Sequence, residues 1–115
     1  MRMWMVDPHT MCRKHLLGEH VEIHMLAGSL LRGRSIAGFL RDKILEPRAM
    51  IQRHAALAAE IAKRGYKHAS PLPTLLVQLP AGKVDTVVSD TELRRRCPEC
   101  RRLKILAAKL ETVVQ

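Results

Sequence analysis

The residues best suited to chemistry lie near the start of the chain, on the first helix that the sequence predicts. At about 100° per residue, His15, Glu19 and Glu22 fall within a stripe roughly 60° wide beside the apolar face of that helix. A carboxylate at the edge of a core is partly removed from water, which raises its pKa toward a range useful for proton transfer. The same spacing also suits a solvated flank with a His–Glu pair, so both interpretations stay open. On another side of this helix are His20 and His24; their i,i+4 spacing could chelate a metal, but two histidines alone are weak evidence and we expect them at the surface.

A second group of chemically capable residues is a Cys-x-x-Cys pair, Cys97 and Cys100, in a strongly basic stretch. Such a pair supplies half of a zinc site, and the other ligands could be Cys12 with His9 or His15, or residues of a second chain. Two cysteines one helical turn apart can also simply pack together. We expect no cofactor to be required for activity, and a structural zinc ion is the one candidate. The arginines around the pair predict a phosphate-contacting patch, with a solvated basic face as the alternative; they are Arg94, Arg95, Arg96, Arg101 and Arg102.

Charge and length narrow the class of protein. The chain has 115 residues, with 20 basic and 11 acidic side chains and a formal net charge of +9. So basic a small domain favours an anionic partner, of which nucleic acid is the commonest, over a merely soluble basic protein. Further candidates for DNA contact are Arg32 and Arg34 in a predicted turn and Arg64 after a predicted helix.

The elements that must position these groups are helices, because apolar residues recur at helical spacing and only three residues are aromatic. We expect a helix from Asp7–Pro8 to about Leu31, followed by a short helix capped by Ser35. A further helix should run from Glu46–Pro47 to Lys63–Arg64–Gly65, and a proline-rich crossover should follow over 66–88, with 75–77 extended or in a buried loop. The last helical region should open with the capping box 89–92 and be interrupted at Pro98. The prediction is an all-α, compact single domain of about four helices over 1–115, with 89–115 as a basic C-terminal helical region. Trp4 is expected to anchor the core.

The setting expected for this chain is intracellular. The cysteines are odd in number, which argues against a disulfide framework, and no apolar run has the character of a signal peptide or the length of a membrane span. We therefore predict a cytoplasmic protein with no membrane partner.

The N-terminal residues resemble a known family. The start Met-Arg-Met-Trp, followed by the helical stripe, is similar to the pyrimidine-dimer DNA glycosylase/AP lyase family, the endonuclease V type of T-even phage. Aligned without gaps, four residues match an arginine, a histidine, an acidic residue and the catalytic glutamate of that family: Arg2, His15, Glu19 and Glu22. A helix ending in Lys-Arg-Gly-Tyr at 63–66 is also similar, and the resemblance covers most of residues 1–96.

The resemblance implies a function and a mechanism. The family's nucleophile is the free N-terminal amine, here that of Met1, and its partner is the helix glutamate, here Glu22. It implies a bifunctional DNA N-glycosylase/AP lyase that acts through a Schiff base on double-stranded DNA carrying a damaged or modified pyrimidine. Arg2 would clamp a phosphate, His15 would orient Glu22 or contact a phosphate, and Glu19 would belong to the DNA-contacting surface. No obligate protein partner is expected, and the location would be the nucleoid, in a cell or in a phage-infected host.

The chain also departs from the family. Position two holds an arginine, so the reactive amine belongs to Met1 and not to an exposed threonine. Val21 and Met25 stand where the phage enzyme has arginines that hold DNA near the lesion, and a basic cysteine-containing stretch replaces its aromatic C-terminal tail. The lesion is therefore left open between a pyrimidine dimer and another damaged or modified base. The rival interpretation is a non-catalytic basic nucleic-acid-binding protein, with or without a stabilising zinc ion.

Overall fold

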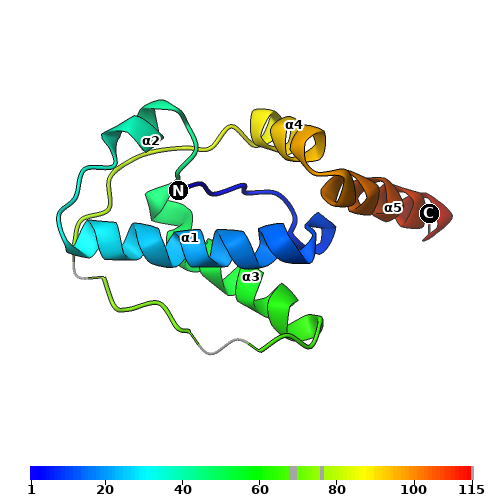
Figure 1. Ribbon diagram of the computed structural model, residues 1–115, viewed down its shortest axis with the longest axis horizontal. Coiled ribbons are helices and arrows are strands. Elements are labelled where there is room, and N and C mark those ends of the chain that lie inside the picture. The colour runs from blue at the N-terminus through cyan, green and yellow to red at the C-terminus, as the bar shows by residue number, and fades with distance from the viewer. Residues whose placement is uncertain (68–69, 76, 115) are drawn as a thin grey trace.

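The computed structural model describes residues 1–67, 70–75 and 77–114, and Figure 1 shows their arrangement. The α-helices are α1 (Arg13–Leu31), α2 (Ala37–Arg41), α3 (Met50–Lys63), α4 (Thr86–Arg96) and α5 (Pro98–Val114), and two 3-10 turns are η1 (Pro8–Thr10) and η2 (Pro47–Ala49). The described ranges contain no strand. The predicted all-α class is confirmed, and the C-terminal region supplies two helices because Pro98 divides it.

Helices α1 and α3 pack against each other at the centre of the molecule (Figure 1). The N-terminal segment runs beside α1, and α4 continues into α5, which extends away from the body. The molecule measures 47 × 31 × 24 Å along its principal axes. None of the described helices combines the length and apolar content needed to cross a lipid bilayer.

The first long helix begins later than its sequence predicts. Asp7 does act as an N-cap, since its carboxylate accepts from the backbone N–H of His9, but it caps only the turn η1. Met11 and Cys12 are extended and end that turn. Helix α1 then starts afresh at Arg13, with the Cys12 sulfur accepting from the backbone N–H of His15. Because Cys12 lies in the extended stretch between η1 and α1, its side chain faces a neighbouring element.

The C-terminal helices also differ from prediction at one boundary. Asp85, and not Ser89, caps α4, because the Asp85 carboxylate accepts from the N–H groups of the first turn. Ser89 is instead buried and donates its hydroxyl hydrogen to the carbonyl of Trp4 at 2.6 Å. The predicted break at Pro98 is confirmed, and the Pro47 start and Gly65 end of the α3 region agree with the structure.

The crossover between α3 and α4 has no regular secondary structure in its described residues. In the segment 75–77, Leu75 packs against the core and Val77 is exposed, whereas Leu76 lies outside the described residues. Gly82 passes close to the α2–η2 region: a Cβ built on it would lie 2.5 Å from a Leu40 methyl and 3.1 Å from the Leu45 carbonyl oxygen. The crossover is therefore tightly packed where it approaches the core.

The core is built from aliphatic and methionine side chains around the N-terminal segment. Met3, Trp4 and Val6 are buried together with the apolar faces of α1 and α3, which include Leu16 and Leu57. The expectation that Trp4 anchors the core is confirmed. Because the N-terminal segment is buried in the core, packing determines the position of its first residues.

Candidate active site

Hydrogen bonds hold the N-terminal segment in a single register. The backbone N–H of Met3 donates to the carbonyl of Ile44 at 2.8 Å, and that of Trp4 donates to the Glu19 carboxylate at 3.0 Å. The Trp4 carbonyl accepts from Ser89, as described above. Ile44, Glu19 and Ser89 thus hold Met3 and Trp4 in place. This in turn positions the two residues before them, Met1 and Arg2.

Glu19 serves this anchoring role and not DNA contact. Its side chain is fully enclosed and forms a bidentate ion pair with Arg53 of α3, with N–O distances of 2.5 and 2.9 Å. Arg53 also donates to the carbonyl of Val6 at 2.6 Å. The expectation that Glu19 contacts DNA is corrected, because its side chain is enclosed and both carboxylate oxygens accept hydrogen bonds from Arg53 or from the backbone N–H of Trp4.

Sequence analysis missed Arg53, although the sequence carries a signal for it. Arg53 precedes Leu57 and Ile61 at steps of four residues, so it lies on the same buried face of α3. A charged residue in such a stripe implies a buried partner of opposite charge, because an unpaired buried charge is very costly.

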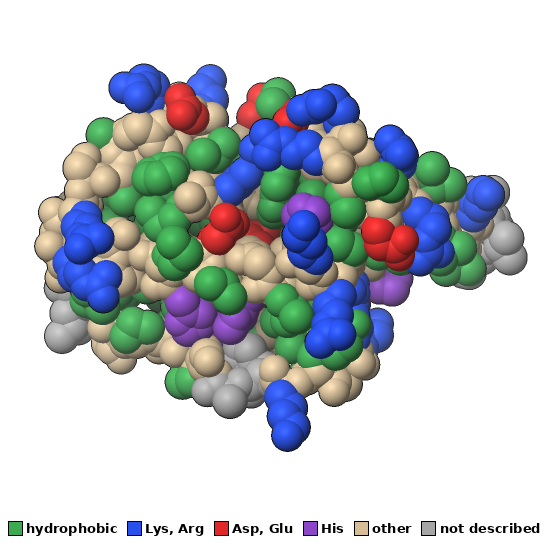
Figure 2. Space-filling view, in the orientation of Figure 1, with side chains coloured by type: hydrophobic (Ala, Val, Ile, Leu, Met, Phe, Trp, Pro, Cys, Tyr) green, Lys and Arg blue, Asp and Glu red, His purple; other side chains and the backbone are tan. Residues whose placement is uncertain are grey.

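Next to this anchor lies a cleft of about 460 Å³, a size within the range of small-ligand sites. It brings together the predicted nucleophile and the predicted acid–base residue, Met1 and Glu22, with Arg2, His15 and Arg96 around them. The cleft is lined by Met1, Arg2, Trp4, Lys14, His15, Gly18, Glu19, Glu22, Phe39, Ile44 and Arg96. In the space-filling view, acidic, basic, histidine and hydrophobic side chains gather near the middle of the face above α1 (Figure 2).

Glu22 is half-buried in this cleft, and its surroundings change its acidity. Burial raises the pKa of the Glu22 carboxyl, opposed by the positive N-terminal amine and assisted by the charge of Glu19; the backbone N–H and guanidinium of Arg2 also lower it. The net effect is a raised pKa, as the sequence predicted for a carboxylate at the edge of the core. The N-terminal amine is near enough to act on Glu22 electrostatically.

Arg2 presents a guanidinium group to the cleft. Its central carbon lies 3.9 Å from the ring centroid of Trp4, and its Nε is buried without a hydrogen-bond partner among the described residues. Burial and the neighbouring Arg96 lower the pKa of Arg2, but a guanidinium remains charged at ordinary pH. A guanidinium group that lines a cleft is suited to an anionic ligand such as a phosphate.

Two of the arginines expected at the DNA surface have structural roles instead. Arg94 is buried and donates to the carbonyls of Thr10 and Cys100 at 2.6 and 3.0 Å. Arg64 donates to carbonyls of the η1 region, including that of Met11 at 2.7 Å. The DNA-contacting expectation is corrected for Arg94 because it is enclosed, and for Arg64 because its Nε donates to Glu60 and its Nη2 donates to carbonyls of the η1 region.

The other predicted arginines are exposed, and one of them lines the cleft. Arg95 and Arg96 form ion pairs with Glu92 at 2.6 and 2.5 Å, and Arg102 pairs with Glu99. Surface pairs of this kind are weak enough to exchange for phosphate. The remaining three lie elsewhere on the surface: Arg32, Arg34 and Arg101.

The predicted metal-binding cysteines do come together. Cys12, Cys97 and Cys100 form one cluster with His15, while the alternative ligand His9 points to Glu60, 3.6 Å away. The fourth group in the cluster is thus His15. The sequence had left these alternatives open.

The histidines expected at the surface are largely internal. His20 is buried and approaches His54 of α3, with 3.1 Å between their Nε2 atoms, and the ring of His24 lies against both. The surface expectation is wrong for His20, because this side of α1 packs against α3.

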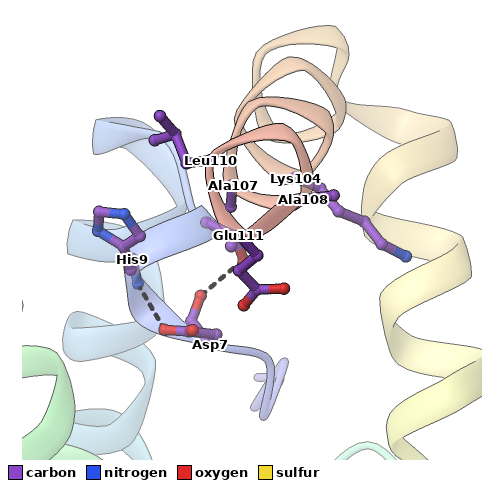
Figure 3. Close-up of a pocket in the computed structure, with 8 residues that line it drawn as sticks. Asp7, His9, Lys104, Ala107, Ala108, Leu110 and Glu111 are labelled. Carbon is purple, nitrogen blue, oxygen red and sulfur yellow. Dashed lines mark hydrogen bonds between the residues drawn. The ribbon is translucent and has the colours of Figure 1, made fainter. Parts of the chain in front are cut away.

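A larger hollow of about 650 Å³ lies between η1 and α5 (Figure 3). Its polar lining includes the carboxylates of Asp7 and Glu111, with His9 and Lys104. It contains neither Met1 nor Glu22, and its acidic groups would repel phosphate. We therefore place the candidate active site in the smaller cleft.

A comparison with protein families identifies the family of the chain. The family described as pyrimidine dimer DNA glycosylase matches residues 1–74, and the chain belongs to this family. No curated protein and no solved structure matches the chain. The matched region contains α1, α2 and α3 and most of the cleft, whereas α4, α5 and the Cys-x-x-Cys pair follow it.

Proposed function

We propose that this protein is a bifunctional DNA glycosylase and AP lyase that acts on a damaged or modified pyrimidine in double-stranded DNA. The α-amine of Met1 is the nucleophile, and Glu22 is its acid–base partner. The observation that supports this most is that the buried N-terminal segment delivers Met1 to the cleft that Glu22 lines. The family to which the chain belongs gives the substrate class.

The chemistry follows from an amine beside a partly desolvated carboxylate. The amine is nucleophilic in its neutral form. Its nitrogen bonds to C1′ of the deoxyribose as the C1′–base bond breaks, and the base leaves with a proton. The sugar ring opens to a Schiff base, loss of a C2′ proton expels the 3′ phosphate, and water then releases the enzyme. Glu22 as carboxylate stabilises the positive charge at C1′ and moves these protons.

The basic groups of the cleft would bind the backbone around the target. The guanidinium-bearing side chains of Arg2 and Arg96 both line this cleft. Attack at C1′ requires that the target nucleotide be turned out of the base stack. A DNA substrate also agrees with the nucleoid location expected from the sequence.

Borohydride trapping tests the proposal. Protein whose mass confirms a free Met1 amine should become covalently linked to a duplex containing an abasic site when borohydride reduces the Schiff base. The matched control carries one extra residue before Met1, which moves the amine by up to about 3.5 Å and should abolish trapping while DNA binding persists. Equal trapping by the extended protein, or none by the free one, would contradict the mechanism. The chain would then be a basic nucleic-acid-binding module.

A further inference from the structure

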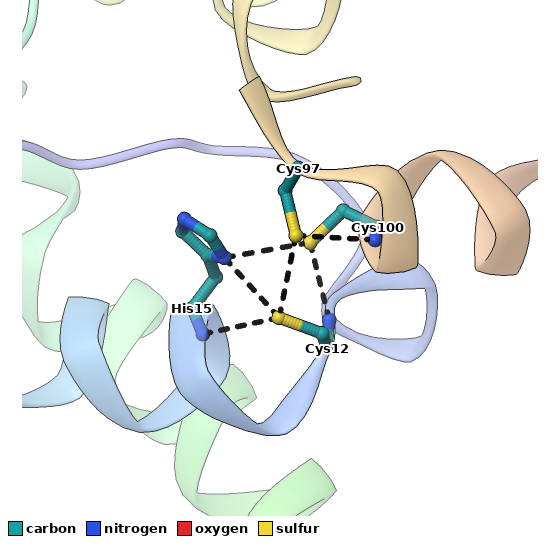
Figure 4. A group of neighbouring side chains, drawn as sticks. All are labelled: Cys12, His15, Cys97 and Cys100. Carbon is teal, nitrogen blue, oxygen red and sulfur yellow. Dashed lines mark hydrogen bonds between the residues drawn. The ribbon is translucent and has the colours of Figure 1, made fainter. Parts of the chain in front are cut away.

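Three cysteines and a histidine meet where the start of α1 touches the junction of α4 and α5 (Figure 4). Cys12 is the N-cap of α1, and His15 lies in the first turn of that helix. Cys97 ends α4, and Cys100 lies in the first turn of α5. Their donor atoms all lie within 4.8 Å of one another. Segments 85 residues apart thus converge on one small volume.

The distances within this cluster suit a tetrahedral ion. With Zn–S bonds of about 2.3 Å and Zn–N bonds of about 2.0–2.1 Å, tetrahedral geometry separates two sulfurs by about 3.8 Å and a sulfur from a nitrogen by about 3.6 Å. The Cys12 and Cys97 sulfurs are 3.8 Å apart, and His15 Nδ1 lies 3.7 Å from the Cys100 sulfur and 3.1 Å from that of Cys12. A disulfide would need sulfurs about 2.05 Å apart, and all three cysteines are free.

The backbone around the cluster favours negatively charged sulfur. Each cysteine sulfur accepts a backbone N–H: Cys12 from His15, Cys97 from Cys100, and Cys100 from Cys12, at 3.3 to 3.4 Å. The positive ends of α1 and α5 point to the same place, and such helix starts stabilise thiolates. Ligand orientation by hydrogen bonds of this kind is typical of metal sites in proteins.

We propose that Cys12, His15, Cys97 and Cys100 bind one structural zinc ion. Three sulfurs and one imidazole nitrogen in a closed tetrahedron select Zn²⁺ over hard cations, which prefer oxygen. All four positions are filled by protein, so the ion has a structural role and no open position for a substrate. Arg94 supports the site by donating to the Cys100 carbonyl and to Thr10.

The site would join the family-matched part of the chain to the helices that follow it. Residues 1–74 match the family, while Cys97 and Cys100 lie beyond this range. His15 also packs edge-to-face on Trp4, with ring centroids 5.9 Å apart, and lines the cleft. The ion therefore holds α4, which carries Arg96, against the wall of the cleft. In this way the zinc ion holds α4 in a position that a larger hydrophobic core would otherwise have to stabilise.

The experiment measures metal and not activity. The full chain, purified under reducing conditions and supplied with Zn²⁺ before dialysis, should retain about one zinc per chain. Cobalt substitution should give the intense thiolate-to-metal absorption and the visible bands of tetrahedral Co²⁺. Stripping the metal with a chelator should lower the melting temperature, and Zn²⁺ should restore it. Less than about 0.1 equivalent of zinc, or a cobalt form without thiolate absorption, would overturn the proposal.

Variants locate the ion. Cys12→Ser and Cys97→Ser should each lose zinc, because they remove ligands from the two sides of the staple. The control is His24→Gln, since His20, His24 and His54 form another group of nearby ring nitrogens; it should retain the metal. Loss of zinc in the histidine variant with retention in both cysteine variants would place the ion elsewhere and overturn the assignment. If the cysteine variants do not fold, the cobalt spectrum of the wild-type protein decides. Borohydride trapping is a separate measurement, so failure of one proposal does not imply failure of the other.

Discussion

Two glutamates three residues apart on α1 have opposite physical situations. Glu19 is 1% exposed and neutralised by a bidentate arginine, so it stabilises the fold. Glu22 is half-buried in a cleft, and its pKa is raised because burial outweighs the nearby positive charges. A carboxylate held at such a cost to stability is typical of a functional site.

Glu22→Gln should separate activity from stability. We expect cleavage of abasic DNA to fall by about 10²–10⁴-fold, the usual contribution of an acid–base group. Because the folded protein raises the pKa of Glu22, ionised Glu22 costs stability above that pKa, and glutamine does not. The melting temperature of the variant should equal or exceed that of the wild type at about pH 8, and the difference should narrow toward about pH 4. Near wild-type cleavage by the folded variant would remove Glu22 from the mechanism.

Glu19→Gln is the matched comparison and should give the reverse pattern. It leaves the buried Arg53 guanidinium without its counter-charge, which typically costs about 3–5 kcal/mol. Urea denaturation should therefore show a much lower free energy of unfolding than in Glu22→Gln. Equal stability of the two variants would contradict the anchoring role assigned to Glu19.

At the scale of elements, the fold depends on irregular segments as much as on helices. The N-terminal segment passes through the core, and the crossover presses Gly82 against Leu40 and Leu45. Neither segment has a helical repeat, so its position comes from specific contacts. Both lie next to elements that line the cleft.

Gly82→Ala tests the packing of the crossover. The added methyl would lie 3.1 Å from the Leu45 carbonyl oxygen and overlap Leu40, so we expect a loss of about 1–3 kcal/mol in unfolding free energy. Gly18→Ala is the control, because a Cβ at this position in α1 meets nothing within 4 Å. It should stabilise the protein by up to about 1 kcal/mol through helix propensity. A neutral Gly82→Ala would show that the crossover is less closely packed than described.

At the scale of the whole molecule, the basic residues behind the net charge of +9 differ in their exposure to solvent. Some arginines are internal hydrogen-bond donors, as Arg53 and Arg94 are, and others remain exposed, including Arg95 and Arg96. Only the exposed ones can release counterions on binding DNA. The electrostatic surface is therefore smaller than the composition suggests.

The salt dependence of DNA binding should reflect this division. Arg96→Ala should reduce the slope of log affinity against log salt by about one unit, because one phosphate contact is lost. Arg41→Ala, which removes an exposed charge from α2 outside the cleft, should change the slope less. Arg94→Ala should lower the melting temperature instead, since it leaves buried carbonyls unsatisfied. Equal slopes for wild type and Arg96→Ala would show that Arg96 contacts no phosphate and belongs to the solvated surface.

The sequence alone determined the features that depend on neighbours along the chain. Helical periodicity gave the all-α class, prolines and Gly65 gave several boundaries, and the spacing of His15 and Glu22 put them on one side of α1. The family match over residues 1–74 agrees with the resemblance seen in the N-terminal motif. These properties are encoded locally, since a helix repeat and a turn residue act within a few positions.

The tertiary structure alone decided which residues meet across the chain. Glu19 and Arg53 are 34 positions apart, and Cys12 and Cys97 are 85 apart, so their contact depends on how helices pack and not on any local pattern. The same packing turned Arg94 inward and chose His15 over His9 beside the cysteines. Burial follows from the relative placement of whole elements. Local spacing shows which face a side chain occupies, but not what that face meets.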